Sequence, residues 1–417
     1  MTLRSYLVSS LMLSLVSVSA MASSVEVLHW WTAGGEAKAA GVLRSYWQAL
    51  GNEWQDSAIS GGGGQSAMTV LKSRALSGTP PEAAHLKGSE LQEWAALGFL
   101  RNLDQAAQQG EWDKVLPEFV QYSVQSQGHY VAVPVGIHRV NWLWVNPKVF
   151  QRYQLTPPDS WPELLVVAKK LKAAGITPLA IGDDQWQLSI LFEAIVLGEG
   201  GSDFYRHAFI QLDQSALQSD TMSHLLDLFH QMRDYIADDY GGTKWNQATH
   251  MLIEGSAAMQ LMGDWVKGEL TAANVIPGKD ILCLPAPGTH GKFSYNLDSI
   301  AMFNVKDHQK QLAQQQLANM IMTSDFQHAF NRVKGSIPVL QNQTLTDFDP
   351  CAQNSAQQLQ LAIKEQQLVP SMAEGMANSS YVRQAIGDVL VSYFNNPDGD
   401  AKQAARQLAR AVLSAQR

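Results

Sequence analysis

Apolar positions along the chain follow two periods, and each change of period marks a change of secondary structure. Residues 25–30 (VEVLHW) are a short run of β-branched and apolar side chains, which predicts a strand. A break at Gly34 and Gly35 follows, and apolar residues then recur at helical spacing through 36–50. A strand, a glycine turn and a helix in this order predict the start of an α/β domain.

Similar patterns recur through the rest of the chain. They predict strands at 130–134, 140–145, 257–261, 281–284 and 299–303, and helices at 66–75, 161–172, 188–197, 245–254 and over most of the chain after residue 307. This alternation favours a fold of the α/β class, with ligand sites at the carboxyl ends of its strands. No Pro-, Gly- or Ser-rich linker divides the chain, which favours two lobes connected by several chain crossings.

Length and charge narrow the possible functions. The 417 residues, 46% of them hydrophobic, are enough for two or three domains at roughly 100–200 residues each. A net charge of −8 argues against nucleic-acid binding, which needs a basic surface. The chain also contains 12 tryptophans, which are either core residues or ligand contacts.

The first residues have the composition of a secretory signal peptide. Arg4 precedes an uncharged, mostly apolar stretch at 6–18, and Ala20 and Ala22 occupy the two positions that a signal peptidase reads. The alternative is a membrane anchor, but the apolar stretch is shorter than the ~20 residues that a spanning helix requires. We therefore expect residues 1–22 to be a cleaved signal peptide and the mature protein to be exported.

Cys283 and Cys351 are the only two cysteines. In an exported protein such a pair favours a disulfide over a metal or redox site, with two separate buried thiols as the alternative.

The sequence lacks the motifs of common enzyme classes. The glycine run at 61–64 is not followed by Gly-Lys-Ser/Thr, so it is no phosphate loop, and it is either a backbone contact for a ligand or a turn. The 11 histidines form no His-Glu-x-x-His motif, and a Gly-x-Ser-x-Gly elbow does not occur. We expect no catalytic residues, no metal and no cofactor.

Trp30 and Trp31 end the first predicted strand, at the edge where an open α/β lobe binds its ligand. Adjacent residues of a strand point to opposite sides, so one ring is expected in the core and the other in the cleft. Sugars combine C–H groups that pack on aromatic rings with hydroxyls that bind charged partners such as Glu36. A core tryptophan and a glutamate favoured at a helix start explain the same residues.

Five segments of the chain resemble the extracellular solute-binding proteins of ABC sugar importers. They are HWWTAGGEAKA (29–39), GGGGQSAMTVLKSR (61–74), VPVGIHRVNWLWVN (133–146), MGDWVKGE (262–269) and KGSIPV (334–339). They span nearly all of the mature chain in order, and they look most like the branch of periplasmic glucose/mannose-binding proteins.

This resemblance implies a class II periplasmic-binding-protein fold, in which two α/β lobes are joined by hinge strands. The N-lobe would hold 23–135 and 300–340, and the C-lobe 136–299 and 341–417. A monosaccharide would bind in the cleft between the lobes and favour their closure. The closed form, a periplasmic monomer, would then deliver the sugar to a membrane permease.

The resemblance also implies which residues contact the sugar. They are the stacking pair Trp30 and Trp31, the hydroxyl acceptor Glu36, the glycine-loop residue Gln65, the cationic donor Lys87 after the second strand, Trp265 stacking from the other lobe, and the acidic Asp298 near the second hinge. The alternatives are a core position for Trp265, a surface position for Lys87 and a turn for Asp298.

Glu374 departs from the resemblance. It lies in VPSMAEGMA (369–377), where the glucose-binding branch implies a histidine. An ionised carboxylate only accepts hydrogen bonds, whereas a neutral imidazole also donates. We expect Glu374 to contact the ligand, to make the cleft more negative, and to shift its preference towards a sugar with more donors, such as an amino sugar. The alternative is that Glu374 pairs with a cation outside the cleft.

Two other functions stay open at this point. Carriers of polyamines and other cations also combine aromatic residues with carboxylates. A secreted glycoside hydrolase could use Glu36 and Asp298 as acid and base, if the two carboxylates flank one glycosidic bond.

Overall fold

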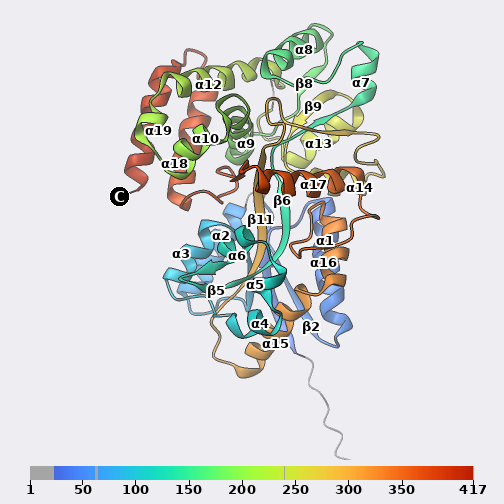
Figure 1. Cartoon of the computed structure of the whole chain (residues 1–417), viewed down its shortest axis with the longest axis vertical. Helices are drawn as coiled ribbons and strands as arrows, with labels where there is room; N and C mark the ends of the chain where they lie inside the picture. Colours follow the sequence, from blue (N-terminus) through green and yellow to red (C-terminus); the bar gives the residue numbers. More distant parts are fainter. Residues whose placement is uncertain (1–22, 62–63, 239, 417) are drawn as a thin grey trace, which may run out of the picture.

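The computed structural model describes residues 23–416, except 62–63 and 239, so the predicted signal peptide (1–22) lies outside the described residues. The chain forms two α/β lobes, and the strands β6 (Ala132–Arg139) and β11 (Phe293–Met302) run lengthwise through the region where they meet (Figure 1). This confirms the predicted fold class. No helix of the described residues is both long and apolar enough to cross a membrane.

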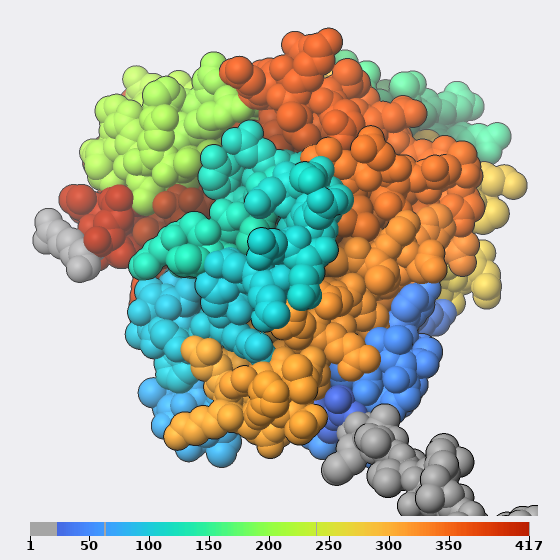
Figure 2. Space-filling view, turned by 60° about the horizontal axis from the view of Figure 1, so that its bottom comes forward, coloured from blue at the N-terminus to red at the C-terminus, as the bar shows by residue number. Residues whose placement is uncertain are grey.

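The N-lobe is the lobe built on a six-stranded sheet in the order β12-β11-β3-β1-β2, with β6 paired to β11. Strands β1 (Ser24–His29), β2 (Glu53–Ala58) and β3 (Ala83–Leu86) are parallel, and β11 runs antiparallel to β3 and β6. The other elements of this lobe are α1 (Gly34–Ala49), α2 (Gln65–Leu76), α3 (Ser89–Ala96), α4 (Asp104–Gln109), α5 (Trp112–Val115), α6 (Glu118–Val124), β4 (Gln125–Ser126), β5 (His129–Tyr130), α15 (His308–Ile321) and α16 (Ser324–Lys334). In Figure 2 the chain after residue 300 (orange) lies beside the N-terminal part (blue to cyan) on one surface.

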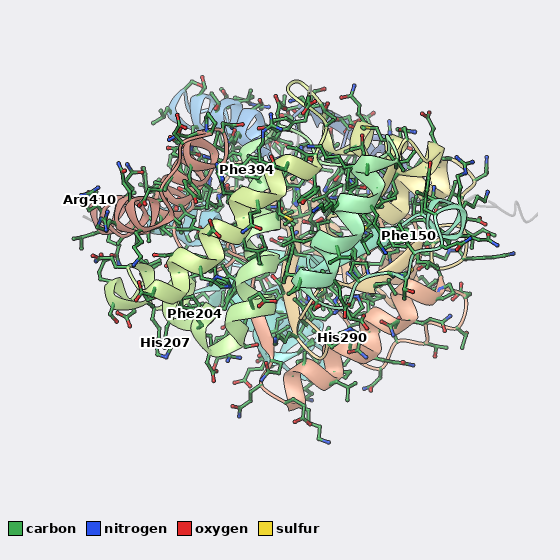
Figure 3. All side chains as sticks on the ribbon, turned by 90° about the horizontal axis from the view of Figure 1, so that it is seen from above. Phe150, Phe204, His207, His290, Phe394 and Arg410 are labelled. Carbon is green, nitrogen blue, oxygen red and sulfur yellow. A yellow bond between two sulfur atoms is a disulfide. The ribbon has the colours of Figure 1, made fainter. Side chains whose placement is uncertain are left out.

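The C-lobe is built on a four-stranded sheet in the order β10-β7-β9-β8. Its strands are β7 (Trp142–Val145), β8 (Thr177–Leu179), β9 (Ala257–Leu261) and β10 (Leu282–Pro285). Its helices are α7 (Pro147–Arg152), α8 (Trp161–Ala173), α9 (Gln185–Ile195), α10 (Gly201–Tyr205), α11 (Gln214–Leu217), α12 (Asp220–Gln231), α13 (Trp245–Glu254), α14 (Val266–Ala272), α18 (Ser380–Phe394) and α19 (Ala401–Ala415). Figure 3 looks down on this lobe, where Phe394 packs against Phe229 with ring centroids 4.8 Å apart.

Each lobe has its own hydrophobic core. The first core draws its buried residues from 25–137 and 293–362, and the second from 143–286 and 369–412. The chain therefore passes between the lobes three times, which explains why the sequence shows no linker. Helix α17 (Pro350–Lys364) lies across the junction (Figure 1) and β12 (Leu368–Pro370) follows it. The residue boundaries given for the lobes above stay a prediction.

The pairing of β6 with β11 changes register where the lobes meet. Asp298 lies opposite Gly136, but Ser299 lies opposite Pro134, so one residue of β6 is extra. Such a bulge bends a strand and increases its twist. A side chain at Gly136 would lie 2.3 Å from Asn331 Oδ1, so this close packing requires glycine. The bulge lies directly beside the side chain of Asp298 in the candidate site.

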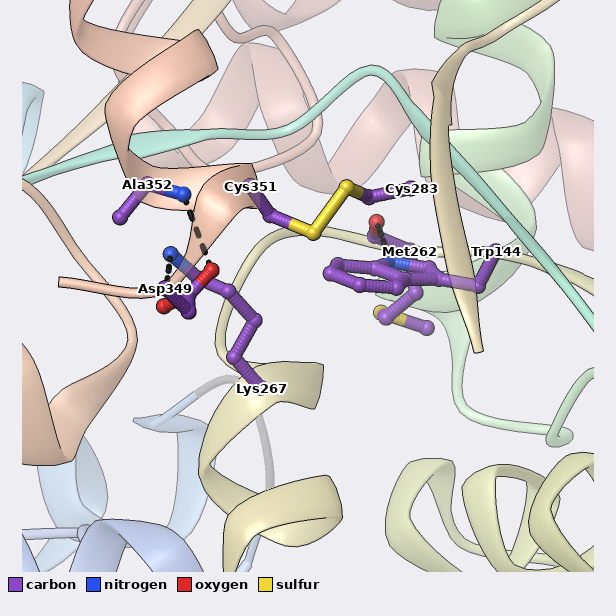
Figure 4. The surroundings of a disulfide bond; sticks show 7 residues. All are labelled: Trp144, Met262, Lys267, Cys283, Asp349, Cys351 and Ala352. Carbon is purple, nitrogen blue, oxygen red and sulfur yellow. Dashed lines mark hydrogen bonds and ion pairs between the residues drawn. A yellow bond between two sulfur atoms is a disulfide. The ribbon is translucent and has the colours of Figure 1, made fainter. Parts of the chain in front are cut away.

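The predicted disulfide between Cys283 and Cys351 is confirmed. It links β10 to the first turn of α17, with Cα atoms 6.0 Å apart. Figure 4 shows Lys267 of α14 beside this bridge, where its Nζ lies 3.5 Å from Asp349, the residue that caps α17. The bridge and the ion pair together fasten α17 to the C-lobe.

Candidate functional site

A cavity between the lobes collects most of the residues that the sequence singles out. Its lining residues are Trp30, Trp31, Glu36, His85, Lys87, Trp186, Trp245, Trp265, Asn296, Asp298, Lys334 and Glu374. The other lining residues lie at the carboxyl ends of β1 and β3, in β11, in α1 and α16, or in the segment after β12, while the C-lobe tryptophans lie at the starts of α9, α13 and α14. The carboxyl ends of parallel strands meet at one edge of a sheet, which is why distant segments converge here.

The N-lobe side of the cavity is a cluster of aromatic rings around His85. The Trp30 ring stacks on His85 with centroids 3.8 Å apart, and the Trp31 ring lies 4.4 Å from the same imidazole. β1 ends at His29, so the strand alternation expected for the two tryptophans does not apply and both rings line the cavity. A Cβ at Gly64 would lie 3.0 Å from the Trp30 ring, so Gly64 packs directly against this side chain.

Three tryptophans form the opposite wall. Trp265 lies 6.1 Å from Trp186 between ring centroids, and its ring packs so closely over Gly263 that a Cβ there would lie 2.2 Å away. Trp245 completes this wall. Trp30 is 6% exposed and Trp265 is 7% exposed, so both rings are almost fully buried where the two lobes meet.

Lys334 is the central charge of the site. Its Nζ lies 3.4 Å from Glu36 Oε1 and 3.5 Å from Asp298 Oδ2. Burial alone would raise the pKa of Asp298, but Lys334, His85 and His138 hold that pKa well below its ordinary value. Burial raises the pKa of Glu36 despite the opposing effect of Lys334.

Two histidines next to Asp298 have pKa values that are shifted in opposite directions. Burial lowers the pKa of His85 to about 4, although its Nε2 lies 3.2 Å from Asp298, so this imidazole is neutral at pH 7. Burial also acts to lower the pKa of His138, but Asp264 and Asp298 on its two sides raise that pKa above the ordinary value. His138 therefore ties the C-lobe residue Asp264 to the crossing strand β11.

Lys87 and Glu374, which both line the cavity, form an ion pair. Lys87 follows β3, which is the third strand of the chain and not the second as predicted. Five buried side-chain atoms of the lining residues have no hydrogen-bond partner, namely Glu374 Oε1, Asn296 Oδ1, Trp186 Nε1 and both ring nitrogens of His85. The site thus offers flat aromatic faces together with unpartnered polar atoms, which suits a ligand with both C–H faces and hydroxyls.

Seven of the eight predicted contact residues line this cavity, which are Trp30, Trp31, Glu36, Lys87, Trp265, Asp298 and Glu374. Gln65 does not; it is exposed, lines a neighbouring pocket and donates to Gln384 Oε1 at 3.4 Å.

Sequence reasoning missed His85, Trp186, Trp245, Asn296 and Lys334. Lys334 lies within the quoted segment KGSIPV and Trp245 begins a predicted helix, so a signal was present for these two. His85 lies two residues before Lys87, and Trp186 lies two residues before the helix predicted at 188–197. Asn296 lies in the part of β11 that was not predicted as a strand.

Known proteins are similar to this chain in sequence. The family described as Bacterial extracellular solute-binding protein matches residues 36–321. A protein of Rhizobium meliloti (strain 1021) named "Probable sugar-binding periplasmic protein" is 42% identical over 408 residues, 98% of each chain. A protein of the same name from Brucella suis biovar 1 (strain 1330) is 42% identical over 94% of this chain and 92% of that protein.

Solved structures of low sequence identity show the same fold. The solute receptor AcbH, described with a preference for β-D-galactopyranose, has a TM-score of 0.80 at 16% identity over 94% of this chain and 99% of its own. The maltose-bound MalE3 of T. maritima has a TM-score of 0.76 at 16% identity, with coverage of 94% and 99%. The resemblance identified in the sequence is thereby confirmed, and the chain belongs to the bacterial extracellular solute-binding proteins.

Proposed function

We propose that the protein is the periplasmic sugar-binding component of an ABC importer and that its cargo is a monosaccharide of the glucose or mannose type. The first part has the support of the relatives, which are named probable sugar-binding periplasmic proteins. The choice of a monosaccharide is our own inference from the cavity. Delivery of the sugar to a membrane permease follows from the importer class.

The observation that carries the proposal is the composition of the interlobe cavity. Five of its twelve lining residues are tryptophans, and five more carry a carboxylate or an ammonium group. Aromatic rings pack against sugar C–H faces, and charged groups form the stronger hydrogen bonds to hydroxyls. We assign stacking to Trp30, Trp31 and Trp265, and hydroxyl binding to Glu36, Lys87, Asp298 and Glu374. Gln65 lines the neighbouring pocket and receives no contact in this assignment.

The closed arrangement suits a small neutral ligand. A sugar that contacts both walls binds the closed state better than the open one, and so shifts the population towards closure. Each carboxylate that lines the cavity already has a lysine partner, since Lys334 contacts Glu36 and Asp298 and Lys87 contacts Glu374. This pairing gives the cationic-solute alternative, including an amino sugar or a polyamine, less support than the carboxylates alone suggested.

The protein is a binding protein and not an enzyme, because the family and the relatives are solute-binding proteins. Glu36 and Asp298 share the ammonium group of Lys334. We therefore infer that they act on the ligand as hydrogen-bond acceptors and not as the acid and base of a hydrolase.

Isothermal titration calorimetry tests the proposal with D-glucose, D-mannose, D-galactose, D-glucosamine, maltose and putrescine. We expect saturable binding of a neutral hexose, and a loss of about tenfold or more in affinity for Trp30→Ala. Trp54→Ala, on the edge strand β2 and outside the cavity, is the matched control and should bind as the wild type does. Binding of putrescine or glucosamine alone would establish the cationic alternative, and binding of maltose alone would contradict the choice of a monosaccharide.

A further inference from the structure

A short segment after β12 carries Glu374 into the cavity. Ser371 is the last residue tied to the large sheet, through its backbone N–H to Tyr295 O at 2.9 Å. Three residues later Glu374 is buried, with one carboxylate oxygen accepting from Lys87 and the other, Oε1, without a partner. The placement of this segment therefore decides where the free oxygen of Glu374 lies.

The segment is held from the C-lobe side by Glu193 of α9. This glutamate is 1% exposed and does not line the cavity. Its Oε2 accepts from Ser371 Oγ at 2.9 Å and from the Ala373 backbone N–H at 2.8 Å, and its Oε1 accepts from Ser294 Oγ of β11. One carboxylate thus joins a C-lobe helix, the crossing strand and the segment that carries Glu374.

The contact is relayed to Glu374 itself. Ser371 Oγ donates to Glu193 and accepts the backbone N–H of Glu374 at 3.1 Å. The hydrogen bonds of Glu193 to residues 371 and 373 lock the turn on both sides of residue 372. The side chain of Glu374, which follows this turn, forms the ion pair with Lys87.

Burying Glu193 is energetically unfavourable if the residue only holds the segment in place. Within the described parts of the chain no Lys, Arg or His lies at ion-pair distance from it, and burial raises its pKa to about 7. A buried carboxylate without a cationic partner is unfavourable unless hydrogen bonds compensate it. A glutamine would fit the same three partners, since its oxygen can accept from Ser371 and Ala373 while its amide donates to Ser294.

We propose that Glu193 is a positioning residue for the sugar site, which acts by holding residues 371–374 so that the free oxygen of Glu374 faces the ligand. This inference rests on the proposed function, because it assigns a ligand contact to Glu374. Glu193 itself makes no contact with the sugar. Its effect on affinity therefore passes through Glu374.

A double-mutant cycle measures this dependence. Calorimetry with D-glucose, D-mannose and D-galactose is carried out on the wild type, Glu193→Ala, Glu374→Gln and the double variant, using the hexose that the wild type binds. We expect Glu193→Ala and Glu374→Gln each to weaken affinity by about tenfold, and the double variant to bind no more weakly than Glu374→Gln alone. Additive losses would show that Glu193 acts elsewhere and would overturn the inference.

Further variants separate positioning from folding. Glu193→Gln should restore most of the affinity that Glu193→Ala loses. Ser371→Ala should weaken binding in the same coupled way, and it serves as the test if Glu193→Ala does not fold. Ser202→Ala is the matched control, because it removes the hydrogen bond to Gln367 before β12 and should leave affinity unchanged.

The two proposals fail in different ways. A wild-type protein that binds none of the three hexoses contradicts the proposed monosaccharide function and this inference with it. Hexose binding together with wild-type affinity in both Glu193→Ala and Ser371→Ala contradicts the inference alone.

Discussion

Lys334 is the residue on which the charge balance of the cavity depends. It is 2% exposed, and its ammonium contacts Glu36 and Asp298 while lying 5.9 Å from the centroid of the Trp31 ring. Burial acts to lower the pKa of Lys334, but Asp298 and Glu36 raise it above the ordinary value. Removing one member of such a buried group leaves uncompensated charge, which costs more than the pair contributes.

We therefore predict that Lys334→Met lowers the free energy of unfolding by about 3 kcal/mol at pH 7. It should also weaken hexose binding, because Glu36 and Asp298 then repel each other or take up a proton. Urea unfolding between pH 5 and pH 8 measures the stability, and calorimetry measures the affinity. The matched control is Lys402→Met, whose exposed pair with Asp220 should contribute less than about 1 kcal/mol.

The pH dependence of this difference follows from the lowered pKa of Asp298. A carboxyl whose folded pKa is depressed contributes stability above its unfolded pKa of about 3.9 and loses it as the pH falls through the folded value. In Lys334→Met the folded pKa of Asp298 rises, so the variant recovers stability by protonation as the pH falls. The deficit should be largest near pH 8 and smaller at pH 5; a constant deficit would contradict the assigned role.

At the scale of elements, the apolar pattern was informative where a helix has one buried face or where a strand is buried along its whole length. The prediction for 245–254 matches α13, and that for 257–261 matches β9. Helix α19 is similar, since Ala404, Leu408 and Val412 are buried at helical spacing. In the two helices the residue type alone tells which side faces the core.

The elements that sequence reasoning missed break this rule. β2 (EWQDSA) is an edge strand with mostly exposed polar side chains, so no apolar run marks it. β11 begins at Phe293 but was predicted only from residue 299, because Ser294, Asn296 and Asp298 are polar although the fold buries them. Buried polar residues look like loop residues in the sequence. This also explains why Asn296 was missed.

The disulfide is an element-scale constraint, since it fastens α17 to β10 over a sequence separation of 68 residues. On the chain-entropy model, Cys283→Ala together with Cys351→Ala should lower the free energy of unfolding by about 4 kcal/mol. Urea unfolding of the double variant and of the oxidised wild type measures this loss. Hexose affinity at 25 °C should stay unchanged, because neither cysteine lines the cavity; a large loss of affinity in a folded variant would show that α17 helps to shape the site.

At the scale of the whole molecule, two sets of contacts hold the lobes together around the cavity. On one side α3 contacts the start of α18, where Ser380 donates to Glu93 at 2.8 Å and Arg383 donates to Glu90 at 3.2 Å. On the other side α1 meets α14, where the Gly35 backbone N–H donates to Glu269 Oε1 at 2.7 Å. Closure therefore depends on close approach at both sides, and the approach at Gly35 leaves no room for a side chain.

Gly35→Ala should prevent full closure. A Cβ at Gly35 would lie 2.4 Å from the backbone of Gly268, so the lobes must stay apart by the space that a methyl group needs. We predict weaker hexose binding, by about tenfold, because the ligand loses contacts that exist only in the closed state. The decrease in radius of gyration on adding saturating hexose, measured by small-angle X-ray scattering, should be smaller than in the wild type.

Gly41→Ala is the matched control, because Gly41 lies in the same helix and no atom lies within 4 Å of the added Cβ. This variant should close and bind normally, and the alanine should stabilise α1 by about 0.5–1 kcal/mol. Normal closure and affinity in Gly35→Ala would show that α1 and α14 do not set the closed state.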